Sequence, residues 1–130
     1  MGNSARQKFS KMGVDRNDYV IVGYKIPYMT KKKDGEYLSQ DIYDNDDKYL
    51  QYIEGWVDEP FRIIIDGMSG NYIAFGKEIA NADEYEGFDF LELNVSDDDF
   101  NLVKDKATNL FNDVDFDFST PKLLVFSHYS

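Results

Sequence analysis

The chain carries few of the side chains that most often perform catalytic chemistry. It has 130 residues, no cysteine and a single histidine, His128, two residues from its end. A Ser-His-Asp triad would have to use this histidine as its base, and the absence of cysteine excludes thiolate chemistry and Cys-ligated zinc. Because His128 falls in a segment expected to be a strand, we interpret it as a structural residue.

The loop Gly67-Met68-Ser69-Gly70 has only a superficial likeness to a phosphate-binding loop. It lacks the lysine and hydroxyl residue of a Walker loop, and it is not expected to lead from a strand into a helix. Glycine at both ends of a short polar loop between two apolar runs instead predicts the turn of a β-hairpin.

Two acidic stretches have part of the pattern of a calcium loop. Residues 44–48 place carboxylates at the first and third positions, but Lys48 stands at the fifth. Asp113, Asp115 and Asp117 fit the first, third and fifth positions, but Phe118 takes the place of the required glycine. Neither stretch completes the ligand set of an EF-hand.

Asp66, Lys77 and Glu78 have the composition of a metal-dependent nuclease site, with the lysine and acid in the reverse of the usual order. A strongly acidic surface would also repel the nucleic-acid substrate of such an enzyme. The sequence therefore predicts no catalytic residue, no metal site and no cofactor, and it favours a protein that is not an enzyme.

The distribution of charge is more informative than the motifs. The formal net charge is −11, which predicts repulsion from nucleic acid and anionic membranes and attraction to basic protein surfaces. Between residues 83 and 117 there are twelve acidic and two basic residues, a balance of −10. We predict that the partner-binding residues lie in this region, and they are Asp83, Glu84, Glu86, Asp113, Asp115 and Asp117.

Some of this acidity has a structural explanation. Asp97, Asp98 and Asp99 fall in the first turn of an expected helix, where carboxylates interact favourably with the backbone dipole. Asp113, Asp115 and Asp117 have no such explanation, and they alternate with apolar residues. In an extended chain they would lie on one face about 6.5–7 Å apart. Such a row of charges could occupy a basic groove that otherwise holds DNA or RNA.

Apolar patterning predicts the fold class. Aromatic and β-branched runs predict strands at 19–26, 61–66, 71–79, 88–95 and 122–128. Helical spacing predicts helices over 40–54 and 97–112, the second with Ser96 as N-cap and Asp99 completing a capping box. The polar run 45–47 is a poor helix interior and leaves open a division of the first helix into two pieces. The expected fold is α+β: a mainly antiparallel sheet of about five strands with two helices on one face, in the order β-α-β-β-β-α-β.

The length fits one domain. Residues 1–16, with a balance of +3, are expected to be a basic N-terminal arm, and residues 17–130 a single α+β domain. The N-terminus has no apolar run of a secretory signal, and no apolar run is long enough to cross a bilayer. We therefore expect a cytoplasmic protein without membrane contact.

The short cysteine-free chain, its many tyrosines and aspartates, and acidic runs such as 43–47 and 96–100 resemble the small acidic proteins encoded by bacteriophages and mobile elements. The resemblance is one of general character over the whole chain, and it assigns no residue a role. It implies a location in the host cytoplasm and inhibition of a host nucleic-acid enzyme by charge mimicry.

The function predicted on these grounds is a non-catalytic acidic binding protein, of the phage-inhibitor type, whose partner is a basic protein surface. One alternative is an assembly protein that forms an oligomer through a tyrosine-rich surface, since ten tyrosines are present. A second is a small enzyme or ligand-binding domain whose site is not written in a motif.

Overall fold

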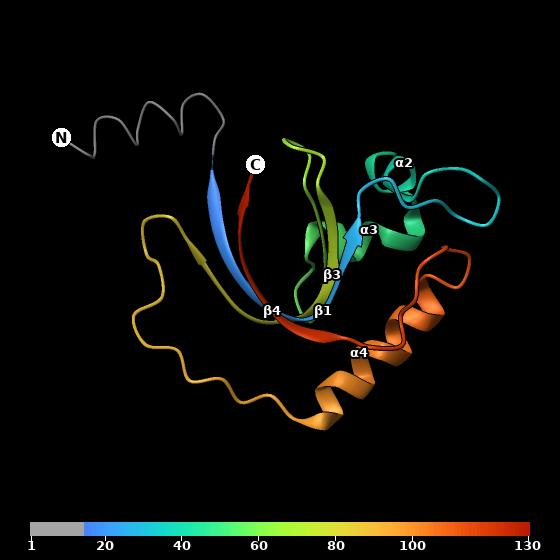
Figure 1. Cartoon of the computed structure of the whole chain (residues 1–130). Coiled ribbons are helices and arrows are strands. Elements are labelled where there is room, and N and C mark those ends of the chain that lie inside the picture. The colour runs from blue at the N-terminus through green and yellow to red at the C-terminus, as the bar shows by residue number, and fades with distance from the viewer. Residues whose placement is uncertain (1–14) are drawn as a thin grey trace.

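The computed structural model describes residues 15–130, which form four strands and three helices around one open antiparallel sheet (Figure 1). The strand order in the sheet is β2-β3-β1-β4. The predicted α+β class with an antiparallel sheet is confirmed. In chain order the elements are β1 Arg16–Pro27, α2 Leu38–Tyr43, α3 Asp47–Glu54, β2 Phe61–Ile65, β3 Tyr72–Asp83, α4 Asp97–Leu110 and β4 Lys122–Tyr129.

The predicted hairpin is present as β2 and β3, which pair from Phe61 opposite Lys77 to Ile65 opposite Ile73. Asp66 holds the turn between them, because its carboxylate accepts hydrogen bonds from the backbone N–H groups of Ser69 and Asn71. The glycine loop is therefore a turn, as its sequence predicts.

The helical segment predicted over 40–54 forms two helices, α2 and α3, which is the alternative that the polar run 45–47 leaves open. The chain turns between them at Asn45, which has a φ of 52°. Asp46 then caps α3 by accepting a hydrogen bond from the backbone N–H of Lys48. Short polar side chains favour such turns and caps over helix interiors, which explains the break.

The strand predicted over 88–95 was also wrong, and the described residues hold four strands where five were expected. Phe88 and Phe90 would lie on one face of such a strand, whereas Leu91, Leu93 and Val95 would lie on the other. No register buries both sets against one core, so pairing is weakly specified. Instead this stretch runs as an unpaired chain from the end of β3 to the start of α4 (Figure 1).

The sheet is sharply bent. Tyr72 lies level with Pro27 of β1 and His128 lies level with Asn17, ten residues apart along that strand. In a flat sheet this offset would separate them by about 33 Å. The rings of Tyr72 and His128 are nevertheless 6.0 Å apart, so the two ends of the sheet curl towards each other, and Figure 1 shows the bend of β1 and β4.

Gly23 of β1 and Gly76 of β3 face each other near the middle of the bend. A Cβ atom on Gly23 would lie 2.0 Å from the carbonyl oxygen of Phe75, and one on Gly76 would lie 2.3 Å from that of Val22. Only glycine permits two backbones to approach so closely. A register shift between Val20 and Ile21 adds a bulge, which increases local bending.

The three helices pack on one face of the sheet. The main core joins Val22 and Tyr24 of β1 and Phe75 of β3 to residues of α2, α3 and α4. Phe111, just after α4, meets the ring of Phe75 edge-on and stacks on Phe118. This aromatic contact ties the chain after α4 to the centre of the sheet.

The predicted N-terminal arm, 1–16, lies almost wholly outside the described residues. Arg16, its last residue, is already the first residue of β1.

The glycine pair generates a stability prediction. Gly23→Ala should lower the free energy of unfolding by about 3 kcal/mol or more, because its methyl group would overlap the Phe75 carbonyl. Gly87→Ala is the control: Gly87 has a φ of 59° but open space around its Cβ position, so the cost should be only about 1–2 kcal/mol. Urea unfolding of both variants measures this, and equal losses would contradict the close-approach explanation.

Candidate functional site

The six acidic residues predicted to bind a partner lie in two separate places. Asp83, Glu84 and Glu86 follow the end of β3, whereas Asp113, Asp115 and Asp117 follow α4. Figure 1 shows these two chain segments on opposite sides of the molecule. The structure therefore does not bring the six together into one binding surface.

The first group begins a turn. One carboxylate oxygen of Asp83 accepts hydrogen bonds from the backbone N–H groups of Tyr85 and Glu86, at 2.9 and 2.8 Å. The N–H of Gly87 donates to the carbonyl of Asp83, and Gly87 adopts a positive φ. Asp83 is thus occupied in shaping the turn that directs the chain away from β3.

Residues 84–96, which we name the acidic–apolar segment, then cross to α4 without regular structure. Four large apolar side chains here are exposed: Phe88, Phe90, Leu91 and Leu93. Phe90 is 93% exposed. Acidic residues stand between them, and residues 83–99 contain eight acids and no lysine or arginine.

The backbone of the middle of this segment, residues 88–95, has no partner strand in the described chain. Within the described part of the chain, no backbone–backbone hydrogen bond outside the named helices and strands involves residues 88–95. No ion pair among residues 15–130 involves the carboxylates of Glu86, Asp89 or Glu92. The segment therefore presents apolar contacts, negative charge and backbone polar groups at the same time.

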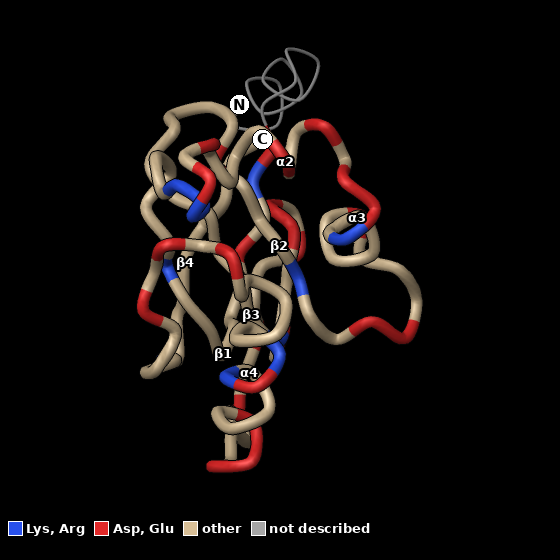
Figure 2. The backbone as a smooth tube through the Cα atoms, turned by 90° about the vertical axis from the view of Figure 1, so that its right-hand side faces the viewer, with Lys and Arg blue, Asp and Glu red and all other residues tan. Residues whose placement is uncertain are grey.

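The acidic–apolar segment ends at a firm anchor, the first turn of α4. Ser96 is the N-cap of α4. The carboxylate of Asp99 accepts hydrogen bonds from the backbone N–H of Ser96 at 2.9 Å and from the Ser96 hydroxyl at 3.3 Å. Asp99 also pairs with Lys77 of β3, and this hydrogen bond is the main cause that lowers the pKa of its carboxyl. Asp97 and Asp98 stay exposed, and Figure 2 shows acidic residues at the tip of the molecule below the α4 label.

The second acidic group lies in a different environment. The chain turns after α4 and forms one bridge, from Val114 to Lys32, so Asp113, Asp115 and Asp117 do not lie on a strand. Apolar and acidic side chains still alternate between buried and exposed positions, because Val114 and Phe118 are buried on either side of the exposed Asp115 and Asp117. The hydroxyl of Tyr24 donates to the carbonyl of Phe118 at 2.8 Å and fixes this stretch on the sheet.

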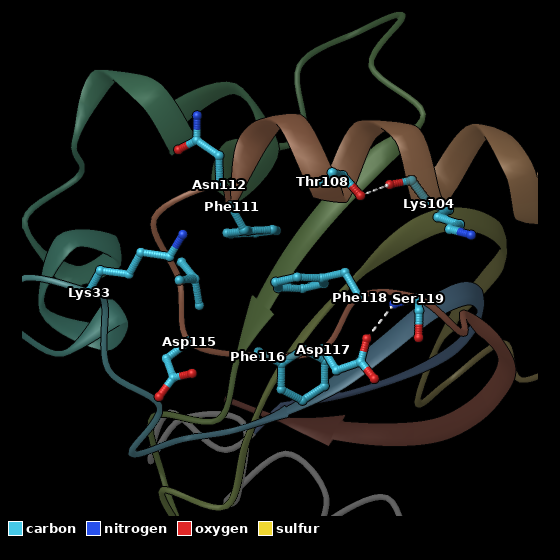
Figure 3. Close-up of a pocket in the computed structure, with 11 residues that line it drawn as sticks. Lys33, Lys104, Thr108, Phe111, Asn112, Asp115, Phe116, Asp117, Phe118 and Ser119 are labelled. Atoms are coloured by element: carbon cyan, nitrogen blue, oxygen red, sulfur yellow. Dashed lines mark hydrogen bonds between the residues drawn. The ribbon is translucent and has the colours of Figure 1, made fainter.

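An open hollow of about 740 Å³ lies beside this stretch. Figure 3 shows the side chains that line it. Its floor is aromatic, with Phe111 and Phe118 stacked, while Lys33 and Asp115 lie towards one end. Lys104 and Asp117 lie towards the other end, and Asp117 accepts a hydrogen bond from the backbone N–H of Ser119. The Ser119 hydrogen bonds are the main cause that lowers the pKa of Asp117, and Lys104 adds a smaller effect.

Lysines therefore accompany the second acidic group. Asp113 pairs with Lys48 of α3 at 3.5 Å, and Lys33 and Lys104 line the hollow with Asp115 and Asp117. The row of unopposed charges expected from the sequence is partly neutralised here. The acidic–apolar segment and the first turn of α4 contain seven acids and no lysine or arginine, and they carry the larger negative charge although Asp99 pairs with Lys77 of β3.

Sequence reasoning missed a cluster on the sheet face that carries no helix. Tyr19, Tyr72 and Phe126 pack there around His128, which is buried. The hydroxyl of Tyr72 and Nδ1 of His128 are 2.7 Å apart, and burial lowers the pKa of the imidazole, with Asp66 opposing the effect. No local pattern points to this pair, because only the bend of the sheet brings it together.

The tyrosines are divided between core and surface. Tyr24, Tyr49 and Tyr52 are buried, whereas Tyr37 and Tyr43 near α2, Tyr85 after β3 and Tyr129 at the end of β4 are exposed. The exposed tyrosines come from different parts of the chain.

Among residues 15–130, no group of three or more histidine, aspartate or glutamate side chains is placed to hold a metal ion. In that same part of the chain, no helix has the length and apolar character to cross a membrane. Comparison with protein-family models, curated proteins and solved structures finds no match to this chain.

The capping box generates a stability prediction. Asp99→Asn should lower the free energy of unfolding at pH 7 by about 1 kcal/mol, because the N-cap and Lys77 lose a charged acceptor. Asp98→Asn, the same change one residue earlier at an exposed position, should change it little. Since the folded pKa of Asp99 lies below 3.8, its contribution is present above that pH and disappears in stronger acid. Urea unfolding at pH 7 and pH 3 tests both points, and equal effects of the two variants would contradict them.

The His128 environment generates a pH prediction. Because the folded pKa lies below 6.5, the unfolded state binds the proton more readily, and stability should fall as pH falls through 6.5. His128 is the only histidine, so His128→Gln should flatten the dependence of unfolding free energy on pH between about 8 and 5.5. The measurement is the urea midpoint across this range, and an unchanged slope in the variant would refute the assignment.

Proposed function

We propose that the protein is a non-catalytic acidic binding protein that docks on a basic surface of another protein through its acidic–apolar segment. One observation carries this proposal: residues 84–96 expose large apolar side chains between acids, and residues 83–99 contain no lysine or arginine. Exposed apolar groups of this size are typical of interaction sites in folded proteins. The acids would steer a basic partner to them.

The anchoring of the segment supports this role. Its start is fixed by the Asp83 turn and its end by the capping box of α4, while the part between has no strand partner in the described chain. Fixed ends reduce the conformational entropy that is lost when the segment becomes ordered on a partner. Phe90 is the most exposed of its apolar side chains and the natural anchor for a pocket.

The partner that best fits is a protein groove that otherwise holds DNA or RNA. Such grooves are lined by lysine and arginine and read negative charge. Eight carboxylates over residues 83–99 supply negative charge in a short stretch of chain. The resemblance to small acidic phage proteins is consistent with this and would make the partner a host enzyme, with the protein acting as its inhibitor.

The test compares two charge-matched triple variants. Glu86→Gln with Asp89→Asn and Glu92→Gln removes three of the four carboxylates of the acidic–apolar segment, while Asp113→Asn with Asp115→Asn and Asp117→Asn removes all three of the second acidic group. Both change the net charge by the same amount. Each variant and the wild type are used as bait in a cell lysate at low salt, and dissociation constants are then measured with the captured protein.

The first triple variant should weaken binding by roughly tenfold or more, and the second by much less, since single surface charges contribute little but add up. Binding should fall with salt, and double-stranded DNA or RNA should compete. Phe90→Ala should also weaken binding, whereas Val57→Ala, at a position 91% exposed elsewhere, should not. A loss confined to the second triple variant would place the site beside α4 and overturn the proposal.

A further inference from the structure

The outer edge of β4 is a second surface to which the fold gives no strand, independent of the acidic–apolar segment. β4 is the last strand in the sheet order, and among residues 15–130 no strand lies on its outer side. It is eight residues long, whereas β2 at the opposite edge has five. The backbone groups that point outward from β4 are therefore open to another strand.

Proteins usually protect such an edge with charges, proline or a bulge. Residues 123–127 of β4, Leu-Leu-Val-Phe-Ser, contain neither charge nor proline, and β4 pairs with β1 without a register shift. Leu123 is 40% exposed and Val125 68% exposed.

We propose that this edge pairs with β4 of a second copy of the chain. The two β4 strands would run antiparallel and be related by a two-fold axis that passes between the two Val125 residues. The two four-stranded sheets would become one continuous sheet of eight strands. Two-fold pairing of identical surfaces is the commonest form of oligomer. The proposal goes beyond the function proposed above and does not depend on it.

Charge selects a second copy as the occupant. A protein of net charge −11 repels its own copies over most approaches, but β4 carries no acid and only Lys122 and His128 as titratable bases, besides Tyr129. The strand is therefore a place where two copies meet without opposed carboxylates. A basic partner, which suits the acidic–apolar segment, gains no charge attraction from this edge.

In this register, the side chains of one β4 strand also suit those that they face on the other. With Val125 opposite Val125, Leu124 lies opposite Phe126, and Lys122 lies opposite His128 rather than opposite another lysine. Apolar residues thus meet apolar residues across the axis, which is the arrangement that stabilises cross-strand pairs. An interface built mainly on one strand pair is small, so the dimer should be concentration-dependent.

Sedimentation equilibrium over micromolar to millimolar protein tests the proposal with Val125→Lys and Val125→Glu. Wild type should dimerise, more strongly as salt screens the repulsion between copies. Each variant alone should raise the dissociation constant of the dimer at least about tenfold, because like charges would meet on the axis. An equimolar mixture of the two should dimerise again, because the introduced lysine of one copy then faces the introduced glutamate of the other.

Val57→Lys and Val57→Glu add the same charges at an exposed site far along the chain and should leave the dimer unchanged. Circular dichroism is the control for folding. Each variant should be folded, because the side chain of Val125 is exposed and its replacement disturbs no core contact. A wild type that stays monomeric over the whole range would overturn the proposal. So would Val125 variants that dimerise like wild type, or a mixture that fails to restore the dimer.

Discussion

The close approach of β1 and β3 at Gly23 and Gly76 is the constraint on which the rest of the structure depends. Two backbones that lie this near leave no room for a Cβ atom on either side. The sheet can therefore bend sharply at the point where these strands cross its middle. A side chain at either position would force the strands apart and flatten the sheet.

The bend gives the sheet two different faces. On one face the helices cover a large aromatic core that includes Phe75, Phe111 and Phe118. On the other face the ends of the sheet curl together, so that Tyr72 reaches His128 and closes a smaller cluster. Among residues 15–130 no strand lies on the outer side of β4, and the chain leaving β3 crosses to α4 as the acidic–apolar segment (Figure 1). Both proposed interaction surfaces thus follow from the shape of the sheet.

Local patterns predicted the local elements well. The hairpin at residues 61–83 and helix α4 follow from turn glycines, apolar spacing and the Ser96 cap, which all act over a few residues. The run at 88–95 has the composition of a strand, but its apolar residues change faces between Phe90 and Leu91, and composition alone does not reveal that. The break at Asn45 was visible in the polar run around it, although its geometry was not.

The candidate site could be predicted only in part. The sequence places the acids, and Glu84 and Glu86 do belong to the segment that we propose for binding, with Asp83 at its start. It does not show that Lys48 and Lys104 come from α3 and α4 to accompany Asp113 and Asp117, because these contacts join distant parts of the chain. The meeting of Tyr72 with His128 depends on the bend itself, which no local pattern specifies.

The central claim is that the acidic–apolar segment binds a partner and that its residues 88–95 pair with no strand in the described chain. The most direct test is amide hydrogen exchange with and without the captured basic partner. In the free protein, residues 88–95 should exchange nearly as fast as an unstructured peptide, while β1 and β3 are protected. With the partner bound, protection should appear in residues 84–96 and leave residues 113–118 unchanged. Slow exchange of residues 88–95 in the free protein, or new protection confined to residues 113–118, would contradict the account.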